Sequence, residues 1–194
     1  MSPIQAMERS YSALKQMLRE GRYAPGARLE ANRLAEELGV SMTPVRDVLH
    51  RLVGERLIEA ASGEGFHVPR LTESELRDLY EWNSALLLIA VRTAREEPQT
   101  LSIEDLLGTA ADQTALVFDR MASAAPNQEI RASIASASDR LHAFRMLEDT
   151  ILEPMIGELD EIMIRDQGQP QSIRRYHLRR MRAVPLLLRE RDKG

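Results

Sequence analysis

The chain has 194 residues, 43% of them hydrophobic and 29% charged, which is enough to bury the core of one medium domain or of two small domains. It contains no cysteine, which excludes disulfides, cysteine nucleophiles and thiolate zinc sites and fits a reducing compartment. The net charge is −4, and residues 1–70 carry 10 Lys and Arg against 9 Asp and Glu, so any affinity for nucleic acid has to come from locally placed charges.

The N-terminal segment predicts an amphipathic helix rather than a targeting sequence. Residues 1–16 lack the apolar core of a signal peptide. Apolar residues recur at helical spacing over residues 4–20, and Gly21 follows where a terminating glycine belongs. The longest apolar run in the chain, residues 85–91, is far shorter than a membrane span. We therefore expect a cytoplasmic protein with no membrane segment.

Two short helices are predicted next. Residues 22–29 contain Pro-Gly and predict a turn. A helix over residues 31–38 is stopped by Gly39, and a second helix is expected over residues 42–55. This spacing of two helices around a tight turn is typical of a helix–turn–helix.

The second of these helices has one apolar side and one polar side. Its N-cap is either Thr43, which precedes Pro44, or Ser41. Arg46 and Arg51 lie off the apolar stripe, where they are either a solvated face or a contact surface for another molecule. The stripe itself consists of Val45, Val48, Leu49, Leu52 and Val53.

The hydrophobic period changes from helical to alternating over residues 57–69. Two short strands are predicted there, with residues 62–65 (Ser-Gly-Glu-Gly) as the turn between them and Pro69 ending the second strand. The order of a helix, a helix–turn–helix and a small hairpin predicts a winged helix in residues 1–70.

The second part of the chain predicts helices only. Thr72 and Glu75 form a capping box, which is a strong signal for the start of a helix. Residues 71–194 are therefore expected to form an all-α antiparallel helical bundle, and the fold class is mainly α. The expected helices span residues 72–97, 102–121, 127–152, 155–166 beyond a break at Pro154, and 173–194 with an interruption near Pro185.

The segment "PGARL…LAEELGVSMTPVRDVLHRLVGERLI…GEGFHV" closely resembles the DNA-binding domain of the GntR family of bacterial transcription regulators. The family pattern has Pro-Gly-x-x-Leu, Leu-Ala-x-x-Leu-Gly-Val-Ser, Thr-Pro-Val-Arg and a Gly-x-Gly wing. The helical remainder, which opens "LTESELRDLYEWNSALL", looks like the effector domain of the FadR-type subgroup, often called FCD. The resemblance implies a transcription regulator that is a metabolite-responsive repressor.

The helix–turn–helix geometry predicts which side chains reach double-stranded DNA. The second helix of such a motif lies in the major groove with its N-terminal residues at the base edges. Arg46 is the best candidate for a base contact, because a guanidinium binds guanine O6 and N7 together. The remaining candidates are Ser41, Met42 and Thr43 on the same helix, Arg28 and Arg33 near the phosphates, and Ser62 and Gly63 at the wing tip.

One such domain contacts few base pairs, so we expect a homodimer on a near-palindromic operator. The helical domain is the natural dimerisation element, and the aliphatic run at residues 84–91 belongs either to its core or to the interface.

The resemblance also implies that the helical domain binds a small organic acid, often through a divalent metal held by one Asp and three His. Asp139 and His142 are three residues apart and share a helix face, and His177 is the only other histidine in this part of the chain. Three ligands make an incomplete site. The alternative is that Asp139 and His142 form a local hydrogen-bonded pair or face solvent.

A stripe of arginines offers a second way to bind a carboxylate. Arg175, Arg179 and Arg182 line one face of the last predicted helix. Such a stripe pairs more often with acidic neighbours, which are available at residues 158–166.

Two other classes of function remain as alternatives to a DNA-binding regulator. One is a metal-dependent enzyme built on the helical domain, although the sequence has no HExxH, phosphate-binding glycine loop or serine elbow. The other is a protein-interaction module that has lost DNA binding. We expect no enzyme activity.

Overall fold

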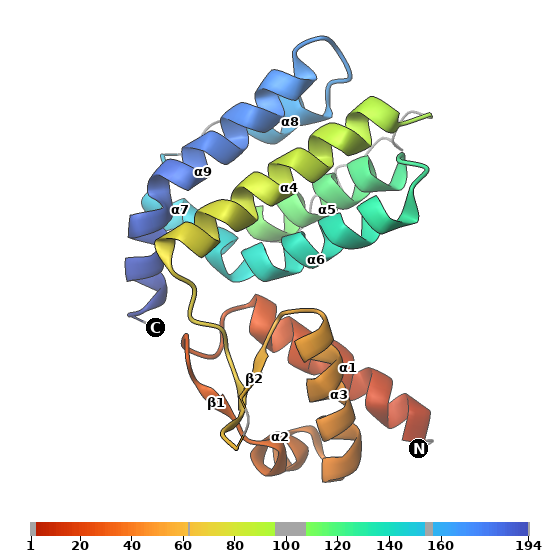
Figure 1. Ribbon diagram of the computed structural model, residues 1–194, viewed down its shortest axis with the longest axis vertical. Helices are drawn as coiled ribbons and strands as arrows, with labels where there is room; N and C mark the ends of the chain where they lie inside the picture. Colours follow the sequence, from red (N-terminus) through yellow and green to blue (C-terminus); the bar gives the residue numbers. More distant parts are fainter. Residues whose placement is uncertain (1–2, 62, 96–107, 154–156, 194) are drawn as a thin grey trace. The chain divides into compact units, whose positions relative to one another are not determined.

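The chain divides after Arg70 into two compact units, and each unit has its own hydrophobic core residues. The computed structural model describes residues 3–61, 63–95, 108–153 and 157–193. The N-terminal unit extends to Arg70, and the helical unit begins at Leu71. Within the described residues, the N-terminal unit contains three helices and three short strands, and the helical unit contains six helices (Figure 1).

The core of the N-terminal unit forms around the third helix. Helices α1 (Pro3–Arg19) and α2 (Ala31–Leu38) both pack against α3 (Met42–Gly54). The predicted apolar stripe of α3 is buried, because Val45, Val48, Leu49 and Leu52 are each at most 1% exposed. Burying each of these side chains contributes about 1.5–3 kcal/mol to stability. The opposite side of α3 is therefore left facing solvent.

The structure distinguishes between the two residues predicted as alternative N-caps of α3. Gly39 ends α2 with φ 65°, a left-handed conformation that a residue without Cβ adopts at little cost. Ser41 is the N-cap of α3, with extended backbone and no cap hydrogen bond from its side chain. Of the two predicted alternatives, Ser41 is confirmed as the N-cap and Thr43 is wrong. Pro44 lies inside the first turn, where a missing N–H removes no intrahelical hydrogen bond.

A small antiparallel sheet completes the winged helix. Strands β2 (Glu59–Ala61) and β3 (Gly65–His67) form the predicted hairpin. Strand β1 (Arg28–Leu29) pairs with the other side of β3, so the strand order is β1-β3-β2. The sequence predicted only a turn over residues 22–29, because a strand of two residues is too short to show alternation.

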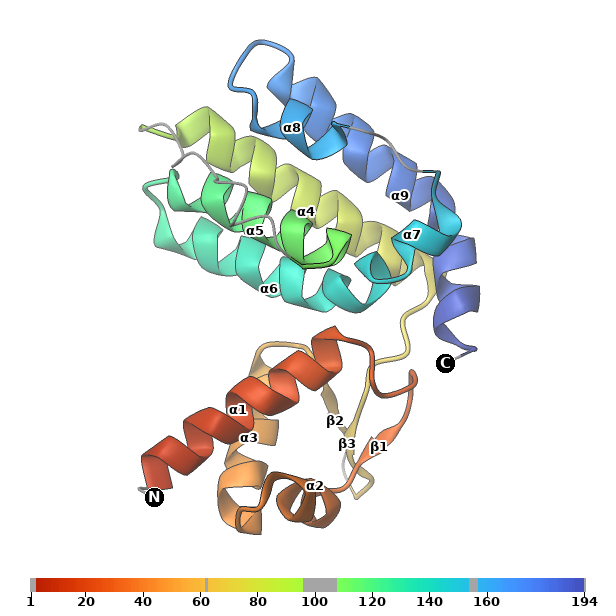
Figure 2. The same cartoon turned by 180° about the vertical axis from the view of Figure 1, so that it is seen from behind.

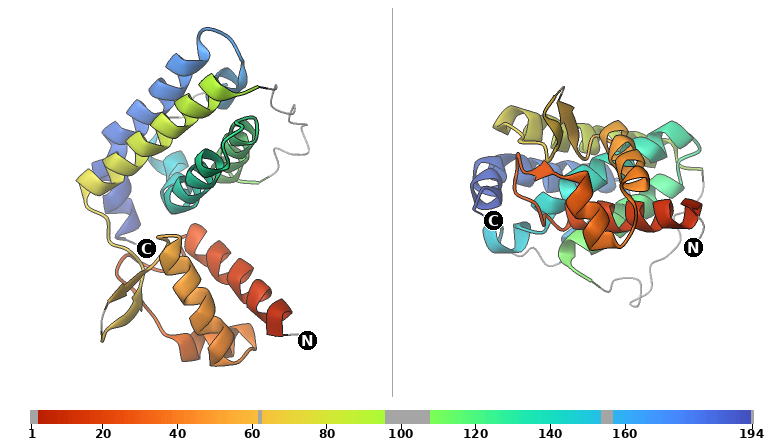
Figure 3. Two further views of the ribbon diagram at one scale, coloured as in Figure 1. Left: turned by 45° about the vertical axis from the view of Figure 1, so that its right-hand side comes forward. Right: turned by 90° about the horizontal axis from the view of Figure 1, so that it is seen from below.

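The helical unit is the predicted all-α bundle. Helices α4 and α9 pack side by side, and α5 to α8 lie on one side of this pair (Figures 1 and 2). Figure 3 shows the same helices turned by 45° and seen from below. The helices are α4 (Glu73–Thr93), α5 (Ala110–Ser123), α6 (Gln128–Arg145), α7 (Glu148–Ile151), α8 (Glu158–Met163) and α9 (Gln169–Arg191).

Several predicted helix boundaries are corrected. Helix α4 ends at Thr93 rather than Glu97, and the start expected near Ser102 lies outside the described residues. The helix predicted to reach residue 152 ends at Arg145, and α7 begins after a tight turn.

Helix α9 begins earlier than predicted, at Gln169, and continues through Pro185. A proline inside a helix costs about 3 kcal/mol. Burial of its neighbours Ala183, Val184 and Leu187 in the bundle core offsets that cost.

None of the helices in the described part of the chain has the length and apolarity needed to span a membrane.

The capping box predicted at the start of α4 is present. The Thr72 hydroxyl accepts a hydrogen bond from the Glu75 N–H at 3.3 Å, and the Glu75 carboxylate accepts one from the Thr72 N–H at 2.8 Å. Both hydrogen bonds satisfy backbone donors that have no partner within the helix.

We expect Thr72→Ala to lower the free energy of unfolding of the helical unit by about 1 kcal/mol, because it removes the side-chain acceptor of the cap. Urea unfolding followed by fluorescence measures this change, since Trp82, the only tryptophan of the chain, lies in α4. Ser74→Ala, two residues away and exposed, is the control. Equal losses in both variants would contradict a specific role for the cap.

Candidate nucleic-acid interface and buried charges of the helical unit

The exposed side of α3 carries the residues predicted to reach DNA. Ser41, Met42, Thr43 and Arg46 are all exposed, and Met42 remains 46% exposed although it is apolar. Arg46 forms no ion pair with any residue that the structure describes. Its guanidinium is therefore available to an external acceptor.

Arg51, which lies on the same helix, is exposed but already has partners within the N-terminal unit. Its guanidinium lies 3.5 Å from the centre of the Tyr11 ring and 3.3 Å from carboxylate oxygens of Glu8 and Glu55. Although partial burial opposes ionisation of Glu55, hydrogen bonds from Tyr11 and Lys15 hold the pKa of this carboxyl below its usual value. This network joins α1 to the end of α3, so Arg51 is a packing residue.

The wing presents a glycine tip with an arginine beside it. Gly63 has φ 80° and open space around it, whereas a Cβ at Gly65 would lie 3.7 Å from Nε of Arg28. Arg28 therefore extends from β1 over the base of the tip. Ser62, the other predicted tip residue, lies outside the described residues. Helix α2, the start of α3 and the β2–β3 turn lie at the same end of the unit (Figures 1 and 2).

Arg33 is exposed and can contact DNA, whereas His50 packs against the wing. Arg33 is 80% exposed and forms an ion pair with Glu30 at 2.9 Å. Such a surface pair contributes at most about 1 kcal/mol, so a phosphate can compete for the guanidinium. His50 packs edge-on against Phe66 with 5.0 Å between ring centres. This contact ties α3 to the wing, and because it joins residues of different elements, it leaves no periodic signal in the sequence.

The three candidate metal ligands do not form a metal site. The described residues contain no group of three or more His, Cys, Asp or Glu side chains that is arranged to hold a metal. His142 is buried, and its Nε2 lies 3.4 Å from Oδ1 of Asp112. Asp139 is half-buried on the same helix. The residues present at these positions therefore do not fit a metal.

His177 has buried partners on both ring nitrogens. Its Nδ1 lies 2.7 Å from the Ile173 carbonyl oxygen. Its Nε2 lies 3.0 Å from Oδ1 of Asn83, an oxygen that also accepts a hydrogen bond from the guanidinium of Arg145 at 3.3 Å. Burial, together with the positive charges of Arg145 and Arg180, lowers the pKa of His177 to about 3 against the raising effect of the Ile173 hydrogen bond. The same positive charges would repel a metal cation at His177.

The predicted arginine stripe of α9 is used mainly for internal ion pairs. Arg175 pairs with Glu161, and Arg179 lies 3.6 Å from Glu158. Arg182 is exposed. The sequence reasoning missed Arg180, which is 6% exposed and pairs with Glu148 and Glu158. Its spacing from the buried Ile173, Tyr176 and His177 places it on the inner face of α9, and that periodicity is the signal that identifies it.

Comparison with known proteins identifies the N-terminal unit. Residues 6–68 match the sequence profile of "Bacterial regulatory proteins, gntR family". Over 97 residues the chain is 40% identical to the HTH-type transcriptional regulator McbR of Escherichia coli (strain K12), a match that covers 48% of this chain and 44% of McbR. It is 29% identical over 140 residues to the Nta operon transcriptional regulator of Aminobacter aminovorans, covering 65% of this chain and 67% of that protein. The matched part of the chain thus spans less than half of McbR.

Solved structures extend the likeness to both units. A transcriptional regulator GntR from Rhodococcus sp. RHA1 has a TM-score of 0.73 at 18% identity, covering 92% of this chain and 97% of that chain. The structure of E. coli McbR has a TM-score of 0.68 at 19% identity, covering 96% and 98% of the two chains. At these identities the likeness shows the fold. It confirms a winged helix–turn–helix followed by a helical domain.

We expect His177 to make the folded chain less stable as the pH falls. Its pKa is about 3 in the folded state and about 6.5 in an unfolded chain. Between these values the unfolded state binds a proton that the folded state does not, so stability is complete above pH 6.5 and is lost towards pH 3.

Urea unfolding at pH 7 and pH 5 measures this effect in the wild type and in His177→Gln. The wild type should lose about 2 kcal/mol of unfolding free energy more than the variant over this interval. Each pH unit below about 6.5 costs about 1.4 kcal/mol, because the unfolded state there binds one proton more than the folded state. The same pH dependence in both proteins would contradict a neutral, buried His177.

Proposed function

We propose that this chain, whose residues 6–68 belong to the GntR family of bacterial regulatory proteins, is a sequence-specific DNA-binding transcription regulator. The observation that carries the proposal is Arg46, which is exposed on the second helix of the motif and has no ion-pair partner among the described residues. The relatives matched by sequence are named as transcriptional regulators. This supports regulation rather than catalysis as the role of the chain.

Helix α3 enters the major groove in this mechanism. Arg46 donates to O6 and N7 of a guanine, which is a pairing that distinguishes this base from the other three. Thr43 and Ser41 reach phosphate or a base edge, and the Ser41 hydroxyl is suited to this because it makes no cap hydrogen bond. Met42 has no charge for a phosphate, so it contacts a thymine methyl group.

The wing and α2 hold the motif on the DNA backbone. Gly63 brings the hairpin tip close to a groove, since it carries no side chain, and Ser62 is its neighbour in the sequence. Arg28, beside the tip, and Arg33, on α2, neutralise phosphates. These contacts position the unit without reading sequence, and they make binding dependent on salt.

The regulator acts as a homodimer on a near-palindromic operator, because a single unit contacts too few base pairs for useful affinity. We assign the dimer contact to the open side of the α4–α9 pair, opposite the side that α5 to α8 cover (Figures 1 and 2). These two helices expose four large apolar side chains: Trp82 and Ile89 on α4, and Leu178 and Leu186 on α9. Apolar side chains of this size are enriched in the centres of interfaces.

The exposed charged side chains of α4 and α9 support a second copy of the chain as the partner. Helix α4 exposes Asp78 and Glu81, whereas α9 exposes Arg174, Arg182 and Arg189. None of these five forms an ion pair with a described residue. In a dimer with a two-fold axis, α4 of each copy can pack against α9 of the other copy. Acidic side chains of α4 then meet basic side chains of α9 in both halves of the interface.

The proposal includes a small metabolite that binds the helical unit and changes DNA affinity, with repression as the default state in the cytoplasm. An organic acid is what the family resemblance implies for this metabolite.

We expect Arg46→Ala to lower the affinity for DNA from the upstream region of the gene about tenfold or more, because one bidentate base contact is lost. Fluorescence anisotropy across a salt series measures the affinity and the number of phosphate contacts. Asp47→Ala, the next residue on the same exposed side, is the control and should not weaken binding. Unchanged affinity in Arg46→Ala, or equal losses in both variants, would contradict the assigned contact.

We expect Trp82→Glu to shift the chain from dimer to monomer, because it puts a charge in the centre of the assigned interface. Sedimentation velocity over a range of concentrations measures the change. Ile164→Glu is the matched control, since Ile164 is 55% exposed and follows α8, away from the open side. A Trp82→Glu variant that stays dimeric at the lowest concentration would contradict this interface.

A further inference from the structure

The imidazole of His50 lies at the junction of α3 and the wing. His50 follows Arg46 by four residues on α3, a spacing that places both side chains on one face of the helix. Both side chains are exposed. Phe66, whose ring meets that of His50 edge-on with 5.0 Å between ring centres, belongs to β3. The exposed face of α3 that carries Arg46 therefore continues through His50 to the wing.

The polar atoms of the His50 ring are not used inside the protein. The contact with Phe66 joins two aromatic rings, and it holds the imidazole in place between α3 and β3. Within the described part of the chain, neither ring nitrogen has a hydrogen-bond partner, and the side chain forms no ion pair. Both nitrogens are therefore available to a group outside the protein.

The protein surrounds this imidazole with little net charge. On α3, Arg46 and Asp47 lie one turn before it and carry opposite charges. On the wing, successive side chains of a strand point to opposite faces of the sheet. The face that carries Phe66 also carries its cross-strand neighbours Leu29 and Ala60, which do not titrate. The charge of the ring is therefore set by the pH and by the molecule that it contacts.

The junction of α3 and the wing is where a DNA strand passes in the proposed function. Helix α3 enters the major groove, and the wing tip at Gly63 approaches the neighbouring minor groove. Neighbouring grooves of B-DNA are separated by one sugar–phosphate strand, so this strand runs between α3 and the wing. A side chain at the junction therefore meets phosphate oxygens rather than base edges.

We infer that His50 contacts a DNA phosphate at this junction and makes the affinity for DNA depend on pH. A neutral imidazole donates one hydrogen bond to a phosphate, whereas an imidazolium donates a stronger, charge-assisted one. Histidine is the side chain that ordinarily gains its proton between pH 8 and pH 5. The affinity for DNA therefore rises as the pH falls through this interval. The inference rests on the proposed function, because it requires α3 in the major groove.

Fluorescence anisotropy at pH 8 and pH 6, across a salt series at each pH, tests the inference with the full chain and the DNA fragment used for Arg46. The affinity should rise about tenfold on going to pH 6, because an opposite charge near 4 Å contributes about fivefold in water in each copy of a dimer. The slope of log affinity against log salt should also steepen by about 1–2, because each newly neutralised phosphate adds about 0.9. Affinity and slope that are the same at both pH values would overturn the inference.

Two histidine variants assign the pH dependence to a position. His50→Gln keeps a hydrogen-bonding side chain without a titrating charge, and it should lose most of the difference between pH 8 and pH 6. His67 follows Phe66 on β3, so its side chain lies on the opposite face of the wing, with Arg28 and Glu59. His67→Gln is therefore the matched control and should keep the wild-type difference. The full pH dependence in His50→Gln, or its loss in His67→Gln, would overturn the assignment to His50.

Failure of this inference is distinguishable from failure of the proposed function. Sequence-specific DNA binding that does not change with pH would leave the regulator intact and overturn the role of His50 alone. The absence of sequence-specific binding at both pH values would contradict both proposals. Circular dichroism of each variant at pH 8 and pH 6 checks that the fold is the same in all of these comparisons.

Discussion

The amphipathic character of α3 is the constraint on which the rest of the account depends. Val48, Leu49 and Leu52 are buried against α1 and α2, and at about 1.5–3 kcal/mol each they fix the rotation of the helix about its own axis. That rotation leaves Arg46 on the solvent side. The network around Arg51 then holds the end of α3 on α1. The DNA-contacting side is thus a consequence of which side the core requires.

The helical unit handles its buried charges in two ways. Arg180 is neutralised by Glu148 and Glu158, an arrangement in which loss of one partner would leave an uncompensated charge. Arg145 is 1% exposed, and its polar contacts are the neutral Ser138 and Asn83, the second of which also faces His177. A positive charge therefore lies beside the histidine that the family resemblance suggested as a metal ligand. The charge of Arg145 therefore opposes the binding of a metal cation at His177.

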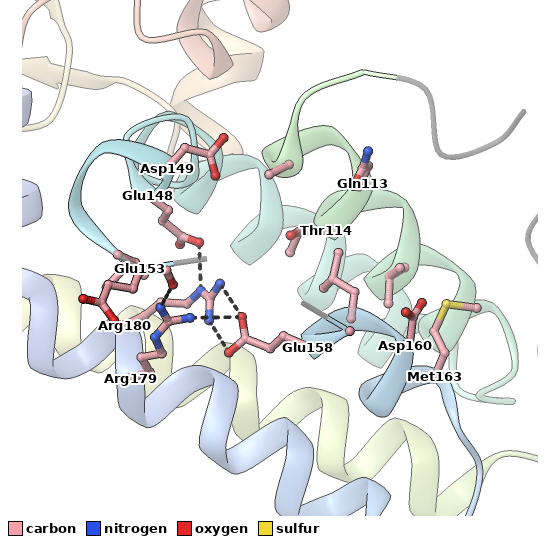
Figure 4. A pocket seen from close by; sticks show the side chains of 15 residues that line it. Gln113, Thr114, Glu148, Asp149, Glu153, Glu158, Asp160, Met163, Arg179 and Arg180 are labelled. Carbon is pink, nitrogen blue, oxygen red and sulfur yellow. Dashed lines mark hydrogen bonds and ion pairs between the residues drawn. The ribbon is translucent and has the colours of Figure 1, made fainter. Parts of the chain in front are cut away.

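The sequence predicted the parts of the fold that have a long period or a strong local signal. The winged helix, the capping box of Thr72 and the buried stripe of α3 all follow from spacing. Strand β1 was missed and the choice between Thr43 and Ser41 as the cap was left open, because each depends on one or two residues. The buried pairing of Arg180 with Glu148 joins residues 32 positions apart, and no sequence period reports such a contact. The same limit hid a cavity of about 390 Å³ whose lining comes from α5, α8, α9 and the segment from α7 to the start of α8 (Figure 4).

The central claim is that Arg46 reads a guanine from the major groove in each half of a symmetric site. Methylation interference at guanine N7 tests this claim most directly, because the methyl group blocks the atom that the guanidinium contacts. The account predicts that methylation of one guanine in each half-site abolishes binding of the wild type, and that Arg46→Ala is indifferent to those two methyl groups. Binding of the wild type that is unaffected by guanine methylation, or an interference pattern in Arg46→Ala identical to that of the wild type, would contradict it.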